Sequence, residues 1–325
     1  MAPRLKLYFR EPDVDTTVPI VAGSVAVPGF DVELVDRLKD ADAWDCAFAQ
    51  RLVDASGARD WISVPAFPNR KFRLSSIYVN TAAGIRSPRD LEGKRVGVRF
   101  WPNTAGVWAR GALRDFYGVD LSAIRWVVLG IDRDGAPPPH WRSELVGWTD
   151  GGRPESEDID AMLLRGEIDA AIDANVLPSI TQRDPRTARL VPDYVAEEKR
   201  YFRATGVFPT SHVVTLRRAY AEAYPDAPMA LLHAFRRARD IAIDAIEGVD
   251  PKVIVVSWLS HYLDEQRALM GENYYSYDVA SNRITLAALT DYAHQQGLTP
   301  RRVAIEEFFH HSTLESLDVR DGAGG

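Results

Sequence analysis

Residues 87–104 read S-P-R-D-L-E-G-K-R-V-G-V-R-F-W-P-N-T, and this stretch carries the clearest fold signal in the chain. Ser87 is a candidate N-cap with Pro88 at the first helical position, and Gly93 ends the short helix that they begin. The residues that follow alternate between apolar and charged, as in a strand. W-P-N-T then introduces a second helix. A helix, a strand and a helix in direct succession predict an α/β fold.

The same alternation extends on both sides of this stretch. Strands are predicted at residues 5–9, 45–49, 61–65, 72–80, 125–129 and 168–172, and helices at 31–39, 104–117 and 158–164. Strands that alternate with helices typically form largely parallel sheets.

The last third of the chain has a different pattern. Residues 212–216 (H-V-V-T-L) predict a strand, and helices follow at 228–247, 251–269 and 284–297. In the first of these helices the apolar residues recur every three or four positions and form one stripe. Only the tail R-D-G-A-G-G (320–325) is expected to be disordered.

The composition is that of a globular protein, with 46% hydrophobic and 26% charged residues. A length of 325 residues favours two domains of roughly 150 residues each. The net charge of −7 argues against a nucleic-acid partner, which requires a clustered basic face. The single cysteine, Cys46, excludes an intrachain disulfide, and its apolar flanks favour a buried structural thiol.

The N-terminus reads M-A-P-R-L-K-L-Y-F and enters a strand almost at once. It contains no apolar segment of signal-peptide length. No window of the chain approaches the ~18 apolar residues that a membrane helix requires. The sequence therefore predicts a soluble cytoplasmic protein without a membrane partner.

Residues 69–81 read N-R-K-F-R-L-S-S-I-Y-V-N-T and bring unusual charge into a predicted strand. Arg70 and Arg73 either protect a sheet edge from aggregation or bind an anion, since a guanidinium pairs with a carboxylate through two hydrogen bonds. Ser75 and Ser76 would point to opposite faces of such a strand. At most one of these two serines is therefore expected to face a ligand.

Several motifs in their order along the chain resemble the 4,5-dihydroxyphthalate decarboxylase family. They are F-P-N-R-K-F-R-L-S-S-I-Y-V-N-T, G-I-R-S-P-R-D-L-E-G-K-R-V-G-V, T-A-G-V-W-A-R-G, L-R-G-E-I-D-A, T-G-V-F-P-T-S-H-V-V and N-R-I-T-L. The second motif alone marks only the fold, whereas the first and third together are more specific. The resemblance covers roughly residues 60–310. Segments 47–56 and 130–157 depart from the family pattern, which leaves the ring substituents of the substrate open.

The resemblance implies a two-lobed type 2 periplasmic-binding-protein-like α/β fold, near the thiamine-pyrimidine-synthase-like group, with a ligand cleft between the lobes. Lobe one would comprise residues 1–81 and 209–325, and lobe two residues 82–208. The implied activity is decarboxylation of a hydroxylated aromatic carboxylic acid, by protonation of the ring carbon and loss of carbon dioxide. The substrate partner is then a small aromatic carboxylate, and the family chemistry requires no cofactor.

This chemistry requires cations for carboxylates and a proton donor at the ring carbon. His212 lies in F-P-T-S-H-V-V, where the chain would cross back between the lobes, and a histidine suits proton transfer near neutral pH. The alternative is a buried histidine held by one hydrogen bond. With the resemblance, His212 is the candidate general acid, and Arg70 and Arg73 are the candidate carboxylate ligands.

The helix that follows W-P-N-T offers a second anion site, because free backbone amides and the helix dipole favour negative charge. Asn103 and Thr104 are candidate caps, ligand contacts or both. Trp101 either stacks on an aromatic ligand or packs in the hinge. Asn175 follows the strand at 168–172, and ligands of open α/β sheets often bind at such strand ends.

The histidines show no metal-ligand spacing, and no metal site is predicted. Two other functions remain open: a solute-binding protein for an aromatic carboxylate, and a different lyase on the same fold. A homo-oligomer is compatible with the sequence but is not specified by it.

Overall fold

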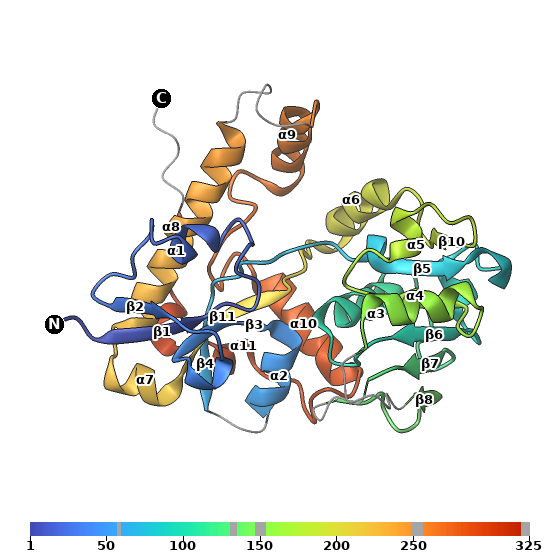
Figure 1. The fold of residues 1–325 in the computed structure, drawn as a ribbon, viewed down its shortest axis with the longest axis horizontal. Coiled ribbons are helices and arrows are strands. Elements are labelled where there is room, and N and C mark those ends of the chain that lie inside the picture. The colour runs from blue at the N-terminus through green and yellow to red at the C-terminus, as the bar shows by residue number, and fades with distance from the viewer. Residues whose placement is uncertain (57–59, 131–134, 147–153, 249–255, 320–325) are drawn as a thin grey trace.

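The computed structural model describes residues 1–56, 60–130, 135–146, 154–248 and 256–319. Its main chain forms two halves, each built around its own β-sheet with helices packed against it (Figure 1). The two-lobed α/β fold expected from the sequence is confirmed. In the described ranges, every helix is too short or too polar to span a lipid bilayer.

The first sheet has the strand order β2-β1-β3-β11-β4. Its strands are β1 (Arg4–Tyr8), β2 (Asp31–Leu34), β3 (Ala43–Ala47), β4 (Trp61–Val64) and β11 (His212–Arg217). The strands β1, β2 and β3 are parallel, whereas β11 runs antiparallel to both β3 and β4. The late strand β11 therefore lies between two early strands, which brings residue 212 beside residue 47.

The second sheet has the strand order β10-β5-β9-β6-β7-β8. Its strands are β5 (Ile77–Asn80), β6 (Arg95–Val98), β7 (Arg125–Val128), β8 (Ser143–Leu145), β9 (Ala170–Ile172) and β10 (Thr187–Arg189). The four strands β9, β6, β7 and β8 are parallel, and β5 and β10 form an antiparallel edge.

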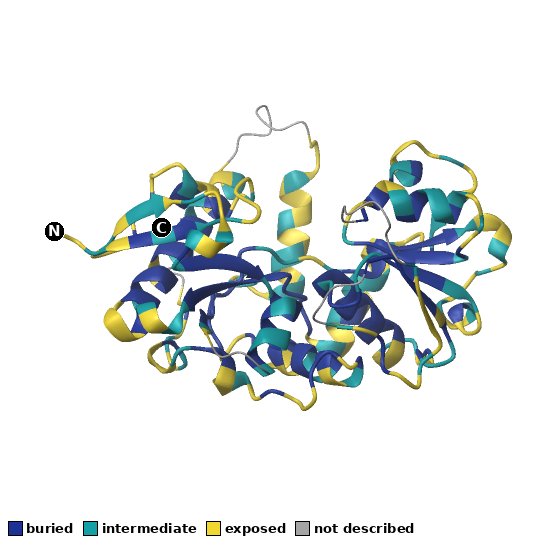
Figure 2. Cartoon of the chain, turned by 60° about the horizontal axis from the view of Figure 1, so that its bottom comes forward, coloured by how far each residue is buried: buried dark blue, intermediate teal, exposed yellow. Residues whose placement is uncertain are grey.

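Eleven α-helices occur in the described residues. They are α1 (Val18–Val21), α2 (Phe48–Ser56), α3 (Thr104–Asp115), α4 (Ser156–Leu164), α5 (Pro178–Thr181), α6 (Tyr194–Thr205), α7 (Arg218–Ala223), α8 (Ala227–Glu247), α9 (Leu259–Met270), α10 (Arg283–Gln295) and α11 (Ile305–Phe308). Short 3-10 turns occur at Leu38–Asp40, Leu74–Ser76, Thr81–Ala83, Pro88–Leu91 and His311–Thr313. Buried residues concentrate in the sheets and on the helix faces that cover them (Figure 2).

Two local predictions were wrong. Residues 31–39 were predicted as a helix, but Asp31–Leu34 form strand β2, because backbone pairing with β1 outweighs a weak local preference for helix. Residues 72–80 were predicted as one strand, but Leu74–Ser76 form a 3-10 turn and β5 begins only at Ile77. The two predicted segments at 251–269 and 320–325 lie partly or wholly outside the described residues.

Two crossing segments join the halves. Residues 65–76 lead from β4 to β5, residues 206–211 lead from α6 to β11, and a bridge between Arg70 and Thr210 pairs them in antiparallel orientation. The division of lobes at residues 81/82 and 208/209 stays a prediction. Strand β5, which that division assigns to lobe one, pairs with β9 in the second sheet.

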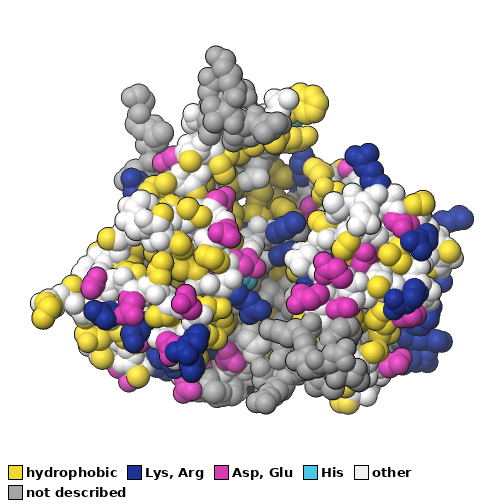
Figure 3. Space-filling model, in the orientation of Figure 1, with side chains coloured by type: hydrophobic (Ala, Val, Ile, Leu, Met, Phe, Trp, Pro, Cys, Tyr) yellow, Lys and Arg dark blue, Asp and Glu magenta, His cyan; other side chains and the backbone are white. Residues whose placement is uncertain are grey.

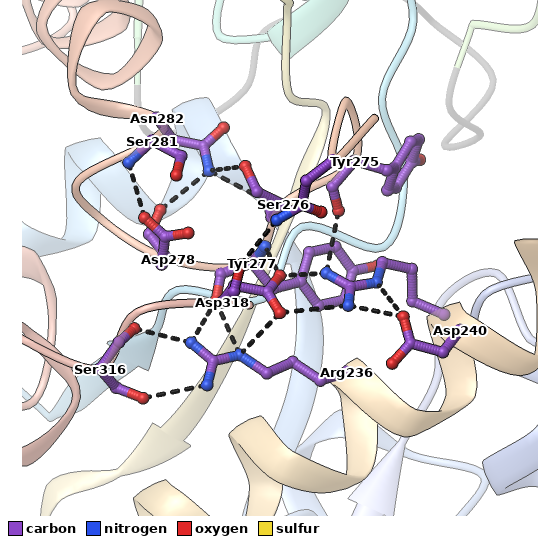
Figure 4. Close-up of polar contacts among 12 residues, drawn as sticks. Arg236, Asp240, Tyr275, Ser276, Tyr277, Asp278, Ser281, Asn282, Ser316 and Asp318 are labelled. Carbon is purple, nitrogen blue, oxygen red and sulfur yellow. Dashed lines mark hydrogen bonds and ion pairs between the residues drawn. The ribbon is translucent and has the colours of Figure 1, made fainter. Parts of the chain in front are cut away.

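A buried polar network fastens the C-terminal segment to α8 (Figure 4). Arg239 is 1% exposed and binds the carboxylates of Asp318 and Asp240. Arg236 donates to the carbonyl oxygen of Tyr277 at 2.8 Å and to that of Ser316 at 2.7 Å. Because these groups satisfy one another, the network can be buried at little cost and holds the segment before α10 beside the crossing segments.

Candidate active site

A cleft of about 320 Å³ lies between the halves, and residues of both sheets line it. Lys and Arg side chains face Asp and Glu side chains across this hollow (Figure 3). From the first half come the loop after β1, the start of α2 and the start of β11; from the second come the end of β6, the start of α3 and the end of β9. The predicted residues His212, Arg73, Asn103, Thr104 and Asn175 all line this cleft.

His212 is held at the cleft by a buried carboxylate. Its Nδ1 atom lies 2.9 Å from Oδ2 of Asp45, which is 1% exposed. An ionised carboxylate only accepts hydrogen bonds, so Nδ1 carries the proton of this bond. The other oxygen of Asp45 accepts from the backbone amide of Arg10. The Asp45–His212 pair therefore fixes the ring and leaves Nε2 toward the cleft.

Glu11 faces that second nitrogen. Its Oε1 atom lies 3.8 Å from Nε2 of His212, and its Oε2 atom accepts a hydrogen bond of 2.7 Å from Asn69. The imidazole is thus placed between a buried carboxylate on one side and a cleft carboxylate on the other. This arrangement can hold a proton at Nε2 and exchange it with a group in the cleft.

Arg73 brings a buried positive charge to the same wall. It is 8% exposed, and its Nη2 atom donates to the hydroxyl of Ser211, the residue before His212. Nη1 lies 3.5 Å from the carbonyl oxygen of Ala174, and Nε has no hydrogen-bond partner among the residues that the structure describes. Burial lowers the pKa of Arg73 to about 10, so the guanidinium is charged at neutral pH. A buried cation with a free donor is suited to an anionic ligand.

The N-terminus of α3 forms another part of the cleft. Asn103 is the N-cap and its side chain accepts from the amide of Gly106 at 3.2 Å, as predicted for a cap. The hydroxyl of Thr104 accepts from the amide of Ala49 in α2 at 3.1 Å, so the first turns of two helices meet here. The positive ends of both helix dipoles therefore add to the field of Arg73.

The opposite wall contains a closed ion pair. Arg99 donates to both carboxylate oxygens of Asp173, at 2.6 and 2.9 Å. The backbone amide of Asn175 donates to the carboxylate of Asp173 at 2.8 Å, and its side-chain amide donates to the hydroxyl of Ser156 at 3.0 Å. Because Asp173 occupies the fork of Arg99, this arginine is less available to a ligand than Arg73.

Four predicted ligand contacts lie away from the cleft. Arg70 donates to the carbonyl oxygen of Phe208 at 2.9 Å and stacks on its ring at 4.3 Å, inside the hinge. Trp101 is fully buried, and Arg110 covers its ring at 3.9 Å. Neither residue lines the cleft: Arg70 packs between the crossing segments, and Trp101 packs against Trp126 and Arg110.

Ser75 and Ser76 also lie outside the lining of the cleft. They belong to the 3-10 turn Leu74–Ser76, and the expected alternation of strand faces does not apply to them. The amide of Ser75 donates to Glu198 at 3.0 Å, and the carbonyl of Ser76 accepts from Asp173. Both serines hold the start of β5 in place.

Sequence reasoning missed Asp45, Glu11 and Arg99. Asp45 was predicted within a buried strand, and a carboxylate in such a strand requires a partner, which was a usable signal. Glu11 and Arg99 follow β1 and β6 as ordinary charged residues, and only the packing of the two halves places them at the cleft. The neighbouring Cys46 is fully buried, which confirms it as a structural thiol.

Within the described residues, no group of three or more His, Cys, Asp or Glu side chains is arranged to hold a metal ion. The two segments that depart from the family pattern both touch the cleft, through Ala47 and Gln50 and through Pro154 and Glu155. Part of the second segment lies outside the described residues.

No protein-family model matches the chain. It is 31% identical to a 4,5-dihydroxyphthalate decarboxylase of Comamonas testosteroni, over 97% of this chain and 99% of that protein. A second protein of that name, from Pseudomonas putida, is 32% identical over 57% of this chain and 77% of its own length.

Solved structures share the fold at low identity. The periplasmic aliphatic sulphonate-binding protein SsuA of Escherichia coli superposes with a TM-score of 0.57 at 13% identity, covering 100% of this chain and 98% of its own. A mutant of the desulfurization enzyme DSZB in complex with biphenyl-2-sulfinic acid gives 0.54 at 13% identity, covering 95% and 96%. These likenesses support the periplasmic-binding-protein-like fold.

Proposed function

The chain belongs to the 4,5-dihydroxyphthalate decarboxylase family, and from this premise we propose that its cleft removes one carboxyl group from 4,5-dihydroxyphthalate or a close analogue. As a member of this family it is a carboxy-lyase. The substrate, the residues and the order of events are our proposal. The single observation that carries it is the Asp45–His212 pair beside the buried cation Arg73.

The positive groups bind the carboxylate that stays on the ring. Arg73 has a donor without a partner, and the first turn of α3 presents backbone amides to the same space. A carboxylate there gains charge-assisted hydrogen bonds from a buried cation, which are stronger than those from a solvated one. This fixes the ring carbon that carries the leaving carboxylate near Nε2 of His212.

His212 supplies the proton. In the proposed step the Nε2–H proton moves to the ring carbon, the bond to the leaving carboxylate breaks, and its electrons restore the aromatic ring as carbon dioxide departs. The ring hydroxyls donate electron density and so stabilise the protonated ring. The imidazole then takes a proton from solvent, with Glu11 beside it at 3.8 Å. One proton is consumed for each carbon dioxide released.

Asp45 acts through His212. Its bond to Nδ1 keeps the proton-donating nitrogen directed at the cleft and stabilises the charged imidazolium before transfer. We further propose that these side chains suffice without a cofactor, because electron release comes from the substrate's own hydroxyls.

The test is turnover of 4,5-dihydroxyphthalate by the purified chain, followed by carbon dioxide release and by the ultraviolet change of the ring. Wild-type protein should release one carbon dioxide per substrate, and His212→Gln should bind substrate but release none. Tight binding without turnover by the wild type would overturn the proposal in favour of a solute-binding protein. Turnover restricted to other cyclic carboxylates would favour a different lyase of the same fold.

A further inference from the structure

A second cavity, of about 420 Å³, opens on the first half of the molecule and is lined by residues of α2, α7, α11 and the segment that follows α11. It shares no lining residue with the cleft between the halves. The cleft touches the first turn of α2, whereas this cavity touches its second half through Arg51 and Ala55. None of its residues takes part in the proposed reaction.

Arg51 is a buried cation at the wall of this cavity. The residue is 1% exposed, and its Nη2 atom donates to the carbonyl oxygen of Trp61 at 2.6 Å. Its Nε and Nη1 atoms are buried and have no hydrogen-bond partner in the part of the chain that the structure describes. A buried guanidinium with two unpaired donors is costly, and the described residues provide no acceptor for them, so its presence beside a cavity points to an acceptor from a ligand.

Other positive or ionisable groups gather at the same wall. Arg218 lines the cavity with a buried Nε atom that also lacks a partner. The rings of His310 and His311 lie 4.2 Å apart. Burial lowers the pKa of His310, and the charges of His311 and Arg218 lower it further. The groups therefore repel one another, and an anion between them would relieve that repulsion.

Two of the three glutamates that line the cavity are paired with arginines outside it. Glu306 and Glu307 line the cavity but bind Arg283 at 3.0 Å and Arg301 at 2.6 Å. The exposed residue Glu222 stands at the rim. Asp54, which is not part of the lining, favours the charged form of Arg51 through its charge.

The rest of the wall is apolar. Ala55, Ile62, Ala221 and Phe309 are buried side chains that line the cavity. A bare inorganic anion would leave this surface without a partner, whereas a carboxylate attached to a small apolar body would cover it. The pattern resembles that of ligand pockets generally, in which an apolar surface holds the body and a few polar groups fix the orientation.

We propose that this cavity is a second carboxylate-binding site, in which Arg51 and Arg218 hold the carboxylate of a small apolar or aromatic acid against the wall of Ala55, Ile62, Ala221 and Phe309. The site is distinct from the cleft, and its occupation does not depend on decarboxylation by the chain.

The test uses benzoate as the probe on the full chain carrying Arg73→Met, which weakens binding in the cleft. Isothermal titration should still detect one benzoate per chain in this background. Adding Arg218→Met should weaken that binding at least about tenfold, since a charged hydrogen-bond donor is lost. Adding Arg86→Met should change it less than about twofold, because Arg86 is an exposed arginine on the second half.

A second variant guards against misfolding. Ala221→Leu keeps every charge and fills part of the cavity, so it should also weaken benzoate binding while its thermal unfolding midpoint shows that the fold is intact. Loss of all benzoate binding in the Arg73→Met background would overturn the proposal, as would full binding by the Arg218→Met variant. Inorganic phosphate is the second probe, and if it binds more tightly than benzoate the assignment to an apolar carboxylate fails.

Discussion

Replacing Arg73 with methionine should weaken substrate binding strongly and change the stability of the free protein little. Arg73 is 8% exposed, donates to Ser211 and has an unpaired Nε atom. In the free protein Glu11 and Glu198 act on this buried charge only from a distance, and its hydrogen bonds within the described residues go to Ser211 and Ala174. In the proposed complex the substrate carboxylate supplies that missing partner.

The magnitudes follow from these contacts. Loss of a charge-assisted hydrogen bond to a bound carboxylate costs about 1.5–3 kcal/mol, which raises KM about tenfold to 150-fold. For the free protein, the variant removes a desolvated cation but leaves the hydroxyl of Ser211 without its donor. These effects largely offset one another, so the free energy of unfolding should fall by less than about 1 kcal/mol or rise.

Steady-state decarboxylation of 4,5-dihydroxyphthalate gives KM, and urea unfolding of the free protein gives stability. The matched control is Lys71→Met, which removes an exposed cation two residues away and should change KM less than about twofold. Because burial lowers the pKa of Arg73 to about 10, wild-type KM should also rise as the pH passes that value, and the variant should lack this rise. An Arg73→Met enzyme with unchanged KM would refute the role of this residue in binding the carboxylate.

The other predictions concern the proton donor, the C-terminal network and metals. Asp45→Asn should lower kcat at least about a hundredfold with little change in KM, because an amide no longer fixes the proton on Nδ1 of His212, and a variant with wild-type kcat would contradict the pairing. Glu11→Gln should lower kcat about tenfold or more if Glu11 exchanges protons with His212, which single-turnover kinetics can separate from product release. Asp318→Asn should lower the free energy of unfolding by about 3 kcal/mol at neutral pH, because it removes the more buried of the two carboxylates that Arg239 binds. Burial acts to raise the pKa of Asp318, but its bonds to Arg239 outweigh burial, and the pKa is lowered. The stabilisation from this carboxylate is therefore present above the unfolded-state pKa and is lost as the pH falls through the folded-state pKa. In acid, the free energies of unfolding of the wild type and the variant should converge. Dialysis against EDTA should leave turnover within about twofold of the untreated enzyme, and a larger loss that added metal restores would disprove independence from a metal.

Several features of the site could be predicted from local sequence alone. The cap at Asn103 follows from W-P-N-T, and the structure has its side chain bonded to the amide of Gly106. His212 was placed at the return between the halves because the alternation of elements breaks there. Arg73 drew attention as a charge entering a buried segment, and it is 8% exposed at the cleft. Each of these signals depends on a few adjacent residues.

Other features depend on distant parts of the chain. Arg70 and Arg73 looked equivalent as cations entering one predicted strand, yet Arg70 forms a bridge to Thr210 and Arg73 immediately precedes the turn Leu74–Ser76. Arg70 stacks on Phe208, whereas Arg73 reaches Ser211. No local pattern distinguishes the two, because the residues that bind them lie about 138 positions further along the chain.

The sequence by itself determined most of the helices and strands, the α/β class and the helix end that presents backbone amides, because capping and alternation act between neighbours. Only the tertiary structure decided which charges meet. The insertion of β11 between β3 and β4 places His212 opposite Ala47 and within 2.9 Å of Asp45, although 167 residues separate the pair. This pairing depends on the order of the strands in the sheet, which is selected by the burial of apolar surface across the whole core. The residues next to Asp45 and His212 in the sequence therefore do not indicate that the two side chains meet.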